Sequence, residues 1–322
     1  MKRLTIFLVA LFIGGGANAQ SLSVSSSASK ITTNLSTIDQ SGLKVTEGGN
    51  LILTAPYSIT DEPDPSLSSY ALPNGAVVVR ENIANFLLYD TFGTVKNSIS
   101  NSTQSEGGES MSEFVSDPAG KTLIVYNPKV INNGKTGSRA KKIDYRNVPI
   151  DIFYSAEREL ASVQVSSNGE FIAFISTKNG SDDEVELTDR FGNMLNTIIF
   201  DQSVKGVTFS ENGLYTTIYS GGRAAVYEVR NGNRVGSTSF RTNVKYAAFS
   251  PEDKTIVALT GEGEELITEL EFHAINVDAR KIVRQEVNES VSFLQQPKFV
   301  RVGKGNYQIQ GFSKDFVLKA AF

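Results

Sequence analysis

Short apolar segments alternate with short polar turns along most of this chain of 322 residues. The pattern is clearest in the stretches 163–174, 207–218 and 248–259. In each, a strand-like segment is followed by a tight turn rich in Ser, Asn, Asp or Gly and by a second strand-like segment. Apolar and polar positions that alternate over a few residues are typical of β-strands, and such turns join strands into hairpins. The pattern predicts an all-β chain.

The tight turns recur at intervals of roughly forty to fifty residues, which indicates a repeat architecture. Aligned by their glycines or an equivalent Asp, they lie at Gly75, Gly120, Gly169, Gly213, Asp253 and Gly303–Gly305. A second series of turns follows further along the units, at 89–94, 188–193, 229–233 and 277–281. Two turns in each unit imply four strands. Four-stranded units bury a continuous core when they stack around an axis, so we predict a β-propeller.

The segment before the first full unit sets the number of blades. Residues 43–55 form two β-rich runs around a Gly48-Gly49-Asn50 turn, typical of a hairpin. This hairpin lies too close to the Gly75 turn to be a full blade. We interpret it as part of a seventh blade shared between the two ends of the chain, which makes seven blades our first choice and six the alternative.

The N-terminus has the organisation of a signal peptide. Lys2 and Arg3 precede an apolar run over 4–13, and Ala17-Asn18-Ala19 is a small-x-small cleavage site. We predict a signal peptide at 1–19, a Ser/Thr-rich arm at 20–41 and a single propeller domain at 42–322. The arm is interpreted as a tether, with a ring-closing strand over 22–29 as the alternative. No other stretch is long and apolar enough to span a bilayer, so we expect an exported protein, periplasmic or at the cell surface.

Composition narrows the possible functions. The chain has no cysteine, which excludes disulfides and a lipid anchor on cysteine. Without Lys2 and Arg3 of the predicted signal, the 31 basic residues become 29 against 35 acidic ones, a net charge of about −6. This acidic balance argues against a nucleic-acid-binding surface over the whole molecule.

Two of the turns carry a family resemblance. Phe209-Ser210-Glu211-Asn212-Gly213 and Phe249-Ser250-Pro251-Glu252-Asp253-Lys254 resemble the Phe-Ser-Pro-Asp-Gly-Lys turn of WD40-like, TolB-type and YVTN-type propeller repeats, and the resemblance covers residues 68–322. The chain has no tryptophan, so it lacks both the Trp-Asp dipeptide of true WD40 repeats and the tryptophan docking motifs of quinone-dependent propeller dehydrogenases. The resemblance implies a rigid disc that binds proteins, peptides or glycans.

The inventory of reactive side chains disfavours an enzyme. His273 is the only histidine, so multi-histidine and Cys-His metal sites are excluded and a Ser-His-Asp triad would depend on this residue. Strand alternation places His273 beside Glu271 on a polar face, where we predict a surface or structural role. The acidic clusters at 61–65 and 182–184 lack the spacing of a calcium loop and are interpreted as solvated loops. The acidic segment 261–271 is interpreted as a soluble loop whose charge protects a strand edge. We therefore predict no catalytic residue, no metal site and no cofactor.

One basic run stands out in this acidic chain. Its members are Lys129, Lys135, Arg139, Lys141, Lys142 and Arg146, against Asp144 as the single acid. Because the run falls in one of the longer intervals between turns, we predict a projecting loop that binds a partner. Another envelope or surface protein, a polysaccharide or anionic lipid headgroups would fit its charge. Nucleic acid is not expected, because export is predicted and Tyr145 is the single aromatic residue among these basic residues.

These observations favour an exported, non-enzymatic propeller that acts as a protein-binding or scaffolding subunit of a bacterial envelope or cell-surface assembly. The alternative is a carbohydrate-active or glycan-binding propeller with carboxylates in its central funnel, since the spatial separation of acidic residues cannot be read from sequence.

Overall fold

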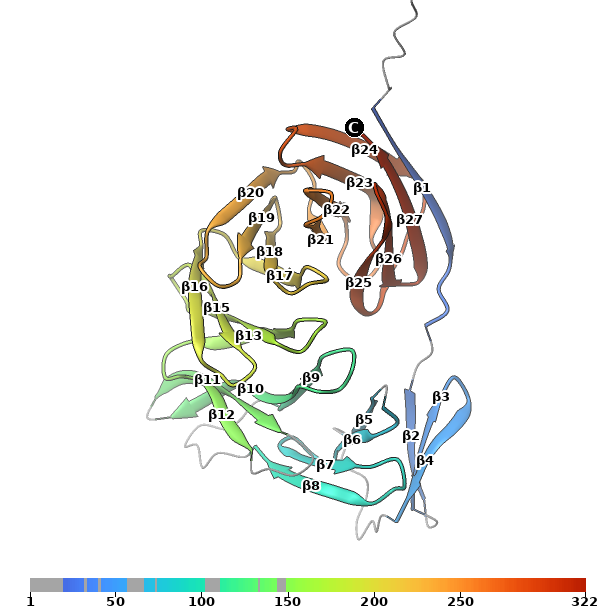
Figure 1. Cartoon of the computed structure of the whole chain (residues 1–322). Helices are drawn as coiled ribbons and strands as arrows, with labels where there is room; N and C mark the ends of the chain where they lie inside the picture. The colour runs from blue at the N-terminus through green and yellow to red at the C-terminus, as the bar shows by residue number, and fades with distance from the viewer. Residues whose placement is uncertain are drawn as a thin grey trace, which may run out of the picture.

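The computed structural model describes residues 20–31, 34–39, 42–56, 67–72, 74–101, 111–132, 134–143 and 149–322. Their regular secondary structure is β throughout, and seven antiparallel sheets follow one another around a central axis (Figure 1). The protein is a seven-bladed β-propeller, which confirms our first choice over the alternative of six blades. The predicted signal peptide and the acidic cluster at 61–65 lie outside the described residues.

Each sheet is one blade, and we number the blades along the chain. Blade 1 comprises β2 (Asn34–Asp39), β3 (Gly42–Glu47) and β4 (Asn50–Ala55). Blade 2 comprises β5 (Ser68–Ala71), β6 (Val77–Arg80), β7 (Asn85–Tyr89) and β8 (Val95–Ser100). Blade 3 comprises β9 (Glu113–Ser116), β10 (Leu123–Asn132), β11 (Lys135–Ile143) and β12 (Ile150–Ser155).

Blades 4 to 6 have four strands each, in the order in which they occur in the chain. Blade 4 comprises β13 (Glu159–Val165), β14 (Phe171–Thr177), β15 (Asp183–Asp189) and β16 (Met194–Phe200). Blade 5 comprises β17 (Val204–Phe209), β18 (Tyr215–Ser220), β19 (Arg223–Glu228) and β20 (Arg234–Ser239). Blade 6 comprises β21 (Val244–Ser250), β22 (Thr255–Glu262), β23 (Thr268–Asn276) and β24 (Lys281–Val287).

Blade 7 joins the two ends of the chain. Its strands are β25 (Phe293–Gly303), β26 (Asn306–Phe312), β27 (Lys314–Ala321) and the N-terminal β1 (Ser21–Ala28). Strand β1 pairs antiparallel with β27 along its whole length, from Ser21 opposite Ala321 to Ala28 opposite Lys314 (Figure 1). The serine-rich segment is thus the outermost strand of the last blade. Leu22 explains its docking, because this side chain is buried in the core that blades 6 and 7 share.

The hairpin at 43–55 does not belong to the blade shared between the termini. With β2 it forms blade 1, a separate sheet of three described strands in the order β2-β3-β4. Leu43, Val45 and Leu53 bury their side chains against Val77 and Val79 of blade 2, so this small sheet packs as a blade in its own right. Our placement of the hairpin was wrong because sequence spacing shows which strands are close in the chain but not which strands pair.

The core consists of apolar layers between neighbouring blades. Separate clusters join blades 1 and 2, 2 and 3, 3 and 4, 4 and 5, 5 and 6, and 6 and 7. The second strands of blades 4 and 6 are buried on both faces along most of their length, which explains the continuous apolar runs at 171–175 and 256–259. Burial of both faces against adjacent sheets is the physical basis of the repeat.

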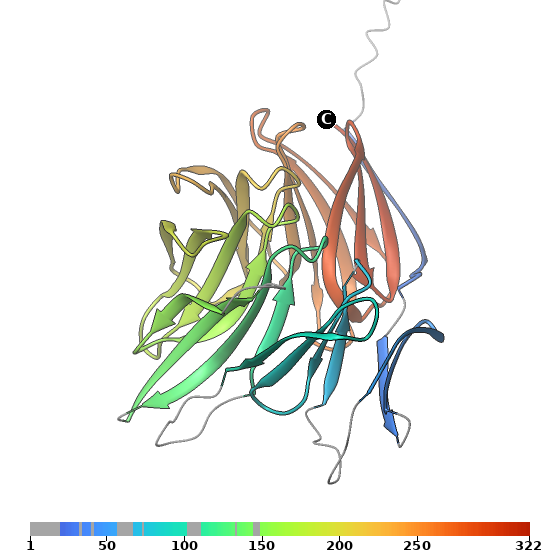
Figure 2. The same ribbon diagram turned by 60° about the horizontal axis from the view of Figure 1, so that its bottom comes forward.

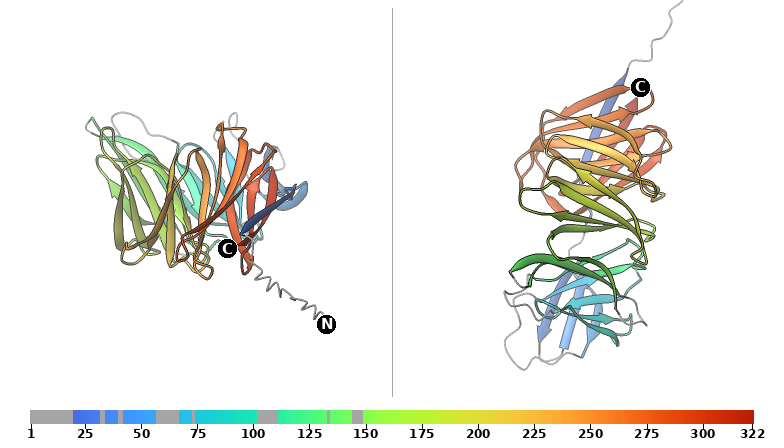
Figure 3. Two further views of the ribbon diagram at one scale, coloured as in Figure 1. Left: turned by 90° about the horizontal axis from the view of Figure 1, so that it is seen from above. Right: turned by 90° about the vertical axis from the view of Figure 1, so that its left-hand side faces the viewer.

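Because successive strands are antiparallel, the turns after the first and third strands of a blade lie on one face of the disc, which we call the turn face. The turns after the second strands and the connections between blades lie on the opposite face, which we call the linker face. Figures 2 and 3 show the strands of each blade running between these two faces. The two turn series found in the sequence are therefore both on the turn face.

Hydrogen bonds account for the repeated Ser-x-Asn-Gly turn. In blade 4 the backbone N–H of Phe171 donates to Ser166 Oγ at 2.9 Å, and Ser166 Oγ donates to Asn168 Oδ1 at 2.7 Å. Gly169 completes the turn with φ of +73°, a conformation that glycine adopts without steric cost. Ser167 Oγ also donates to the carbonyl of Glu211 in the next blade at 3.1 Å. The motif that carried the family resemblance is thus a structural device.

Candidate functional site

The basic residues predicted to form a binding loop lie on strands instead. Lys129 is in β10 and Lys135, Arg139, Lys141 and Lys142 are in β11, while Arg146 lies outside the described residues. The two strands stay paired up to Asn132 and Lys135, so almost the whole interval is one long hairpin. The prediction of a loop was wrong because a count of charges does not show whether two segments pair as strands.

These basic side chains do not gather in one patch. Lys135 and Lys142 are seven residues apart on β11, which is about 23 Å along a strand. Lys135 lies near the linker face, whereas Lys142 lies near the turn face with its Nζ 5.2 Å from the centre of the Phe191 ring. Arg139 donates to the carbonyl of Asn101, and burial lowers the pKa of Lys141. The residues of the basic run therefore make separate local contacts and do not form one binding surface.

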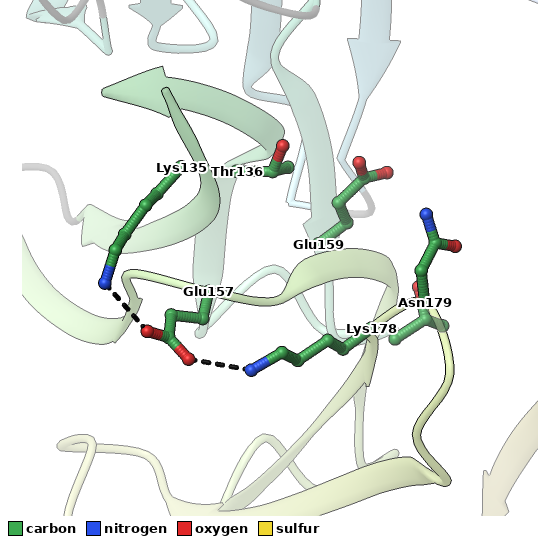
Figure 4. Close-up of a pocket in the computed structure, with 7 residues that line it drawn as sticks. Lys135, Thr136, Glu157, Glu159, Lys178 and Asn179 are labelled. Atoms are coloured by element: carbon green, nitrogen blue, oxygen red, sulfur yellow. Dashed lines mark hydrogen bonds and ion pairs between the residues drawn. The ribbon is translucent and has the colours of Figure 1, made fainter. Parts of the chain in front are cut away.

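Two of the predicted residues lie at a polar cavity on the linker face. The cavity has a volume of about 420 Å³ and is formed where blades 3 and 4 meet. Its lining consists of Lys135, Thr136, Glu157, Glu159, Thr177, Lys178 and Asn179 (Figure 4). Beside it, Lys129 Nζ forms an ion pair of 2.8 Å with Glu159. Basic and acidic side chains alternate around the cavity, so its charges largely compensate one another.

Glu157 is the centre of this cavity. Its carboxylate accepts from Lys135 Nζ at 2.9 Å and from Lys178 Nζ at 2.7 Å, as Figure 4 shows. Lys178 and Lys135 together lower the pKa of Glu157 to about 2, and Glu157 raises the pKa of Lys135. A carboxyl group with so low a pKa stays ionised near neutral pH and is poorly matched to general acid catalysis. This arrangement is an ion-pair bridge between blades.

A second cavity, of about 470 Å³, occupies the central channel. Its described lining comes from the innermost strands and turns of blades 2 to 7. Among its polar members are Gln164, Ser167, Thr208, Glu211, Gln296 and Lys298, and Phe209, Tyr246 and Phe299 provide apolar surface. A concave site with mixed apolar walls and a few convergent polar groups is the usual form of a ligand site.

The innermost strand of blade 7 shapes this channel. Register is lost between Phe293 and Lys298 of β25, and Gln296 lies in this irregular stretch. The side-chain amide of Gln296 donates to Gln164 of blade 4, across the channel. Sequence analysis did not single out these residues. A usable signal existed, because Gln164 and Thr208 each lie a few positions before an aligned turn glycine, where inner strands approach the turn face.

The carboxylates at the channel are not arranged as a catalytic pair. Asp117 caps its own turn, since one carboxylate oxygen accepts from Ala119 N at 2.9 Å and the other accepts from Thr122 N at 2.5 Å. The other carboxylate in the described lining is that of Glu211. Glycosidases of the usual type need two carboxylates on either side of the scissile bond. With Asp117 bound to backbone amides, this lining does not provide such a pair.

His273 is buried on β23, beside a third cavity of about 360 Å³ between blades 5 and 6. Thr260 Oγ1 lies 3.1 Å from its Nε2, and Glu271 Oε2 lies 3.2 Å from the same nitrogen. A triad needs its nucleophile and its acid on different ring nitrogens. Burial, together with the charge of Arg284, lowers the pKa of His273 to about 4. The contacts of this histidine are those of a packed side chain.

The acidic segments within the described residues also serve structural contacts. Asp183 Oδ2 accepts from Val204 N of the next blade at 2.8 Å, and Glu184 pairs with Arg158 at 3.1 Å. Glu262 accepts from Asn243 at 3.1 Å. In the part of the chain that the structure describes, no three His, Cys, Asp or Glu side chains are grouped closely enough to hold a metal ion. No helix of that part is long and apolar enough to cross a membrane.

Comparisons with known proteins establish the fold alone. No family model matches the chain, and no curated protein matches it. Among solved structures, one described as the crystal structure of the eukaryotic initiation factor superposes with a TM-score of 0.54 at 14% sequence identity. The match covers 80% of this chain and 63% of that protein. As many as 1107 solved chains match this structure, a breadth that selects no single function.

Proposed function

We propose that this protein is an exported, non-enzymatic binding propeller that acts as a scaffolding subunit in a bacterial envelope or cell-surface assembly. The observation that carries the proposal is the cavity in the central channel, to which the inner strands of blades 2 to 7 all contribute. The turn motif, which resembles that of WD40-like, TolB-type and YVTN-type repeats, supports a role in binding. The signal-like sequence at 1–19 supports export.

The chemistry of the channel suggests what kind of group it holds. The lining has amides, hydroxyls, two carboxylates and one ammonium between aromatic and aliphatic walls, so both hydrogen-bond donors and acceptors are present. An extended polar segment of a partner protein would satisfy such a lining with its own backbone and side chains. A sugar chain has similar hydrogen-bonding groups, which keeps glycan binding as the second candidate. Hydrolysis is less supported, because Asp117 already binds backbone amides.

A matched pair of variants tests the channel. Ser167→Trp places a large ring at the channel, whereas Ser203→Trp makes the same change at an exposed connection on the linker face. Native envelopes would be mildly cross-linked, and the protein purified through a C-terminal tag. We expect a partner in fixed ratio with the wild type and Ser203→Trp, and about tenfold less with Ser167→Trp. Equal recovery with both variants would remove the channel from the proposal.

Export is tested separately. The N-terminal sequence of the mature protein should begin at Gln20 if the signal peptide is cleaved after Ala19. Retention of Met1 and of the whole protein inside the cell would refute export. A panel of glycans, assayed for both binding and cleavage, separates the second candidate from the first.

A further inference from the structure

The innermost strand of blade 7 carries a bulge that blades 4 to 6 have in a shorter form. In each of those blades one extra residue shifts the register at the start of the innermost strand, within 160–162, 204–206 and 244–246. In blade 7 the paired residues of β25 step from Phe293 to Lys298. The four residues between them, 294–297, lie opposite Gly311 of β26 alone. We call residues 294–297 the channel bulge, since enlarged bulges commonly occur beside functional sites.

Gly311 is what allows the channel bulge to pass close to β26. It has φ of +112°, and a Cβ atom there would lie 2.6 Å from Cα of Pro297. Pro297 has no N–H group and cannot donate to a strand ladder. The channel bulge is therefore held by strand pairing at its two ends, whereas its middle is free of the sheet.

One side chain of the channel bulge crosses the channel. Gln296 lines the central cavity, and its amide donates to Gln164 Oε1 of blade 4, three blades away around the ring. Figure 1 shows β25 at the inner side of blade 7, so a contact from this strand to blade 4 extends across the centre. Gln164 is itself oriented, because its Nε2 donates to Ser162 Oγ at 3.2 Å. The two glutamines thus close the channel between opposite walls.

This closure has little else to hold it. Leu294 is 46% exposed, and Gln295 and Gln296 are exposed as well. A hydrogen bond between side chains that water can reach contributes little net stability, and segments with few buried apolar contacts open more easily than the core. Ile309 and Phe312 of the neighbouring β26, in contrast, are buried in the core of blades 6 and 7. The channel bulge can therefore move without unfolding its blade.

We propose that the channel bulge gates the central channel and that the bond between Gln296 and Gln164 holds the gate closed. A segment that enters the channel replaces this bond, because glutamine amides have donors and an acceptor that pair with peptide groups as well as with each other. A ligand shifts such an equilibrium only through contacts made in the open state, and the two released amides provide them. This inference rests on the proposed function, since the channel is the site that the gate regulates.

Cysteine labelling tests the gate directly, because the chain contains no cysteine. Thr208→Cys is the reporter, since Thr208 lines the channel at the position in blade 5 that Gln164 has in blade 4. The rate of its reaction with fluorescein maleimide is measured in the folded protein. Added to this reporter, Gln164→Ala or Gln296→Ala should each increase the rate about fivefold, as loss of one net hydrogen bond predicts.

The matched control is Gln295→Ala. Gln295 is exposed in the same bulge but does not line the cavity, so its replacement should leave the labelling rate unchanged. Circular dichroism confirms that each variant is folded. Unchanged rates in the Gln164 and Gln296 variants, or an equal increase in the control, would overturn the proposal.

A charge pair separates the bond from the size of the side chains. Gln164→Glu/Gln296→Lys replaces the hydrogen bond by an ion pair and should return labelling to the wild-type rate or below it. Gln164→Lys/Gln296→Lys places two like charges across the channel and should label as fast as the alanine variants. If the two double variants label equally fast, contact between these side chains does not hold the gate.

Labelling needs no partner, so the gate and the proposed function fail in different ways. In the cross-linking assay, Gln296→Ala should increase the recovered partner, because a larger fraction of the protein is open. If the reporter responds but the wild type recovers no partner, the gate stands and the proposed function is refuted. If a partner is recovered but the reporter does not respond, the proposed function stands and the gate is refuted.

Discussion

Among the carboxylates that join neighbouring blades in this propeller, Asp253 and Glu157 lie on opposite faces of the disc. On the turn face, Asp253 of blade 6 accepts from both Nε and Nη2 of Arg301 in blade 7, at 2.9 and 3.0 Å. On the linker face, Glu157 accepts from Lys135 and Lys178 at similar distances. The Asp253 side chain is 8% exposed, whereas that of Glu157 is 51% exposed. The same chemistry is thus placed in two different dielectric environments.

Burial determines what each bridge contributes. The planar guanidinium of Arg301 binds Asp253 through two bonds, and Gly305 N donates a third at 3.2 Å. Removing one partner of a buried pair leaves an uncompensated charge and is strongly destabilising. Water screens the flexible lysines around Glu157, and exposed pairs of this kind contribute little. The bridge on the turn face should therefore stabilise the fold, whereas the one on the linker face should affect mainly the local charge.

The largest effect is expected from Asp253→Asn. This change keeps the shape of the side chain but removes the charge that pairs with Arg301, and we expect a loss of about 3 kcal/mol in the free energy of unfolding. Urea denaturation measures it, with the exposed neighbour Glu252→Gln as the control. A loss no greater than that of the control would contradict the importance of burial.

The pH dependence of the same carboxyl can be measured with this variant. Burial raises the pKa of Asp253, but the hydrogen bonds from Arg301 and Gly305 outweigh it, and the net pKa is lowered. A carboxyl with a lowered pKa in the folded state contributes stability above its unfolded pKa and loses it as the pH falls. The difference between wild type and Asp253→Asn should therefore shrink in acid.

His273 should produce the next largest effect, through pH. Its pKa falls from 6.5 to about 4 in the folded protein. The stability that the neutral ring contributes is complete above pH 6.5 and is lost as the pH falls toward 4, by up to about 3 kcal/mol. We expect His273→Gln to remove this part of the dependence. Urea denaturation of both proteins between pH 7 and pH 4 provides the comparison, and parallel curves would exclude the effect.

A smaller effect is expected from Ser166→Ala in the turn of blade 4. The substitution removes the acceptor for Phe171 N in a buried turn, and we expect a loss of about 1 kcal/mol. Ser203→Ala, at an exposed connection on the linker face, is the matched control. Thermal unfolding of the two variants compares them directly. If Ser203→Ala lowered the unfolding midpoint as much, the hydrogen bond within the turn would not be the cause.

The smallest effect is expected from Glu157→Gln. The carboxylate is exposed and its lysine partners can turn to water, so the unfolding midpoint should barely move. The pKa of Lys135 should fall toward its ordinary value, because Glu157 is what raises it. NMR titration of the lysine side chains measures this change. A large drop in the midpoint would show that the two bridges are more alike than their exposure indicates.

The fold was largely predictable because its signals are local. The turns at Gly169 and Gly213 need a positive φ, and the Ser and Asn beside them bond within the same turn. Hydrogen bonds between residues so close in the sequence can be inferred from a few consecutive residues. The turns at Asp90 and Asp189 were equally predictable as a second series, but the sequence did not indicate that Phe92 and Phe191 are exposed.

The candidate sites were less predictable because they depend on contacts between distant segments. Lys135 and Lys178 are in different blades, and only the packing of these blades brings both to Glu157. Gln296 reaches Gln164 across the channel through an irregular stretch of β25. The basic run was predicted to be a loop because the count of charges gives no information on strand pairing.

The sequence by itself determined the all-β class and the repeat of four-stranded units, since turn chemistry and strand periodicity act over short distances. It left the choice between seven and six blades open. Only the tertiary structure decided that β1 completes the last blade and that the hairpin at 43–55 belongs to blade 1. It also decided which carboxylates are buried and which side chains share a cavity. Pairing and burial depend on the free energy of the whole chain, where one blade is the environment of the next, and that information is not contained in any single segment.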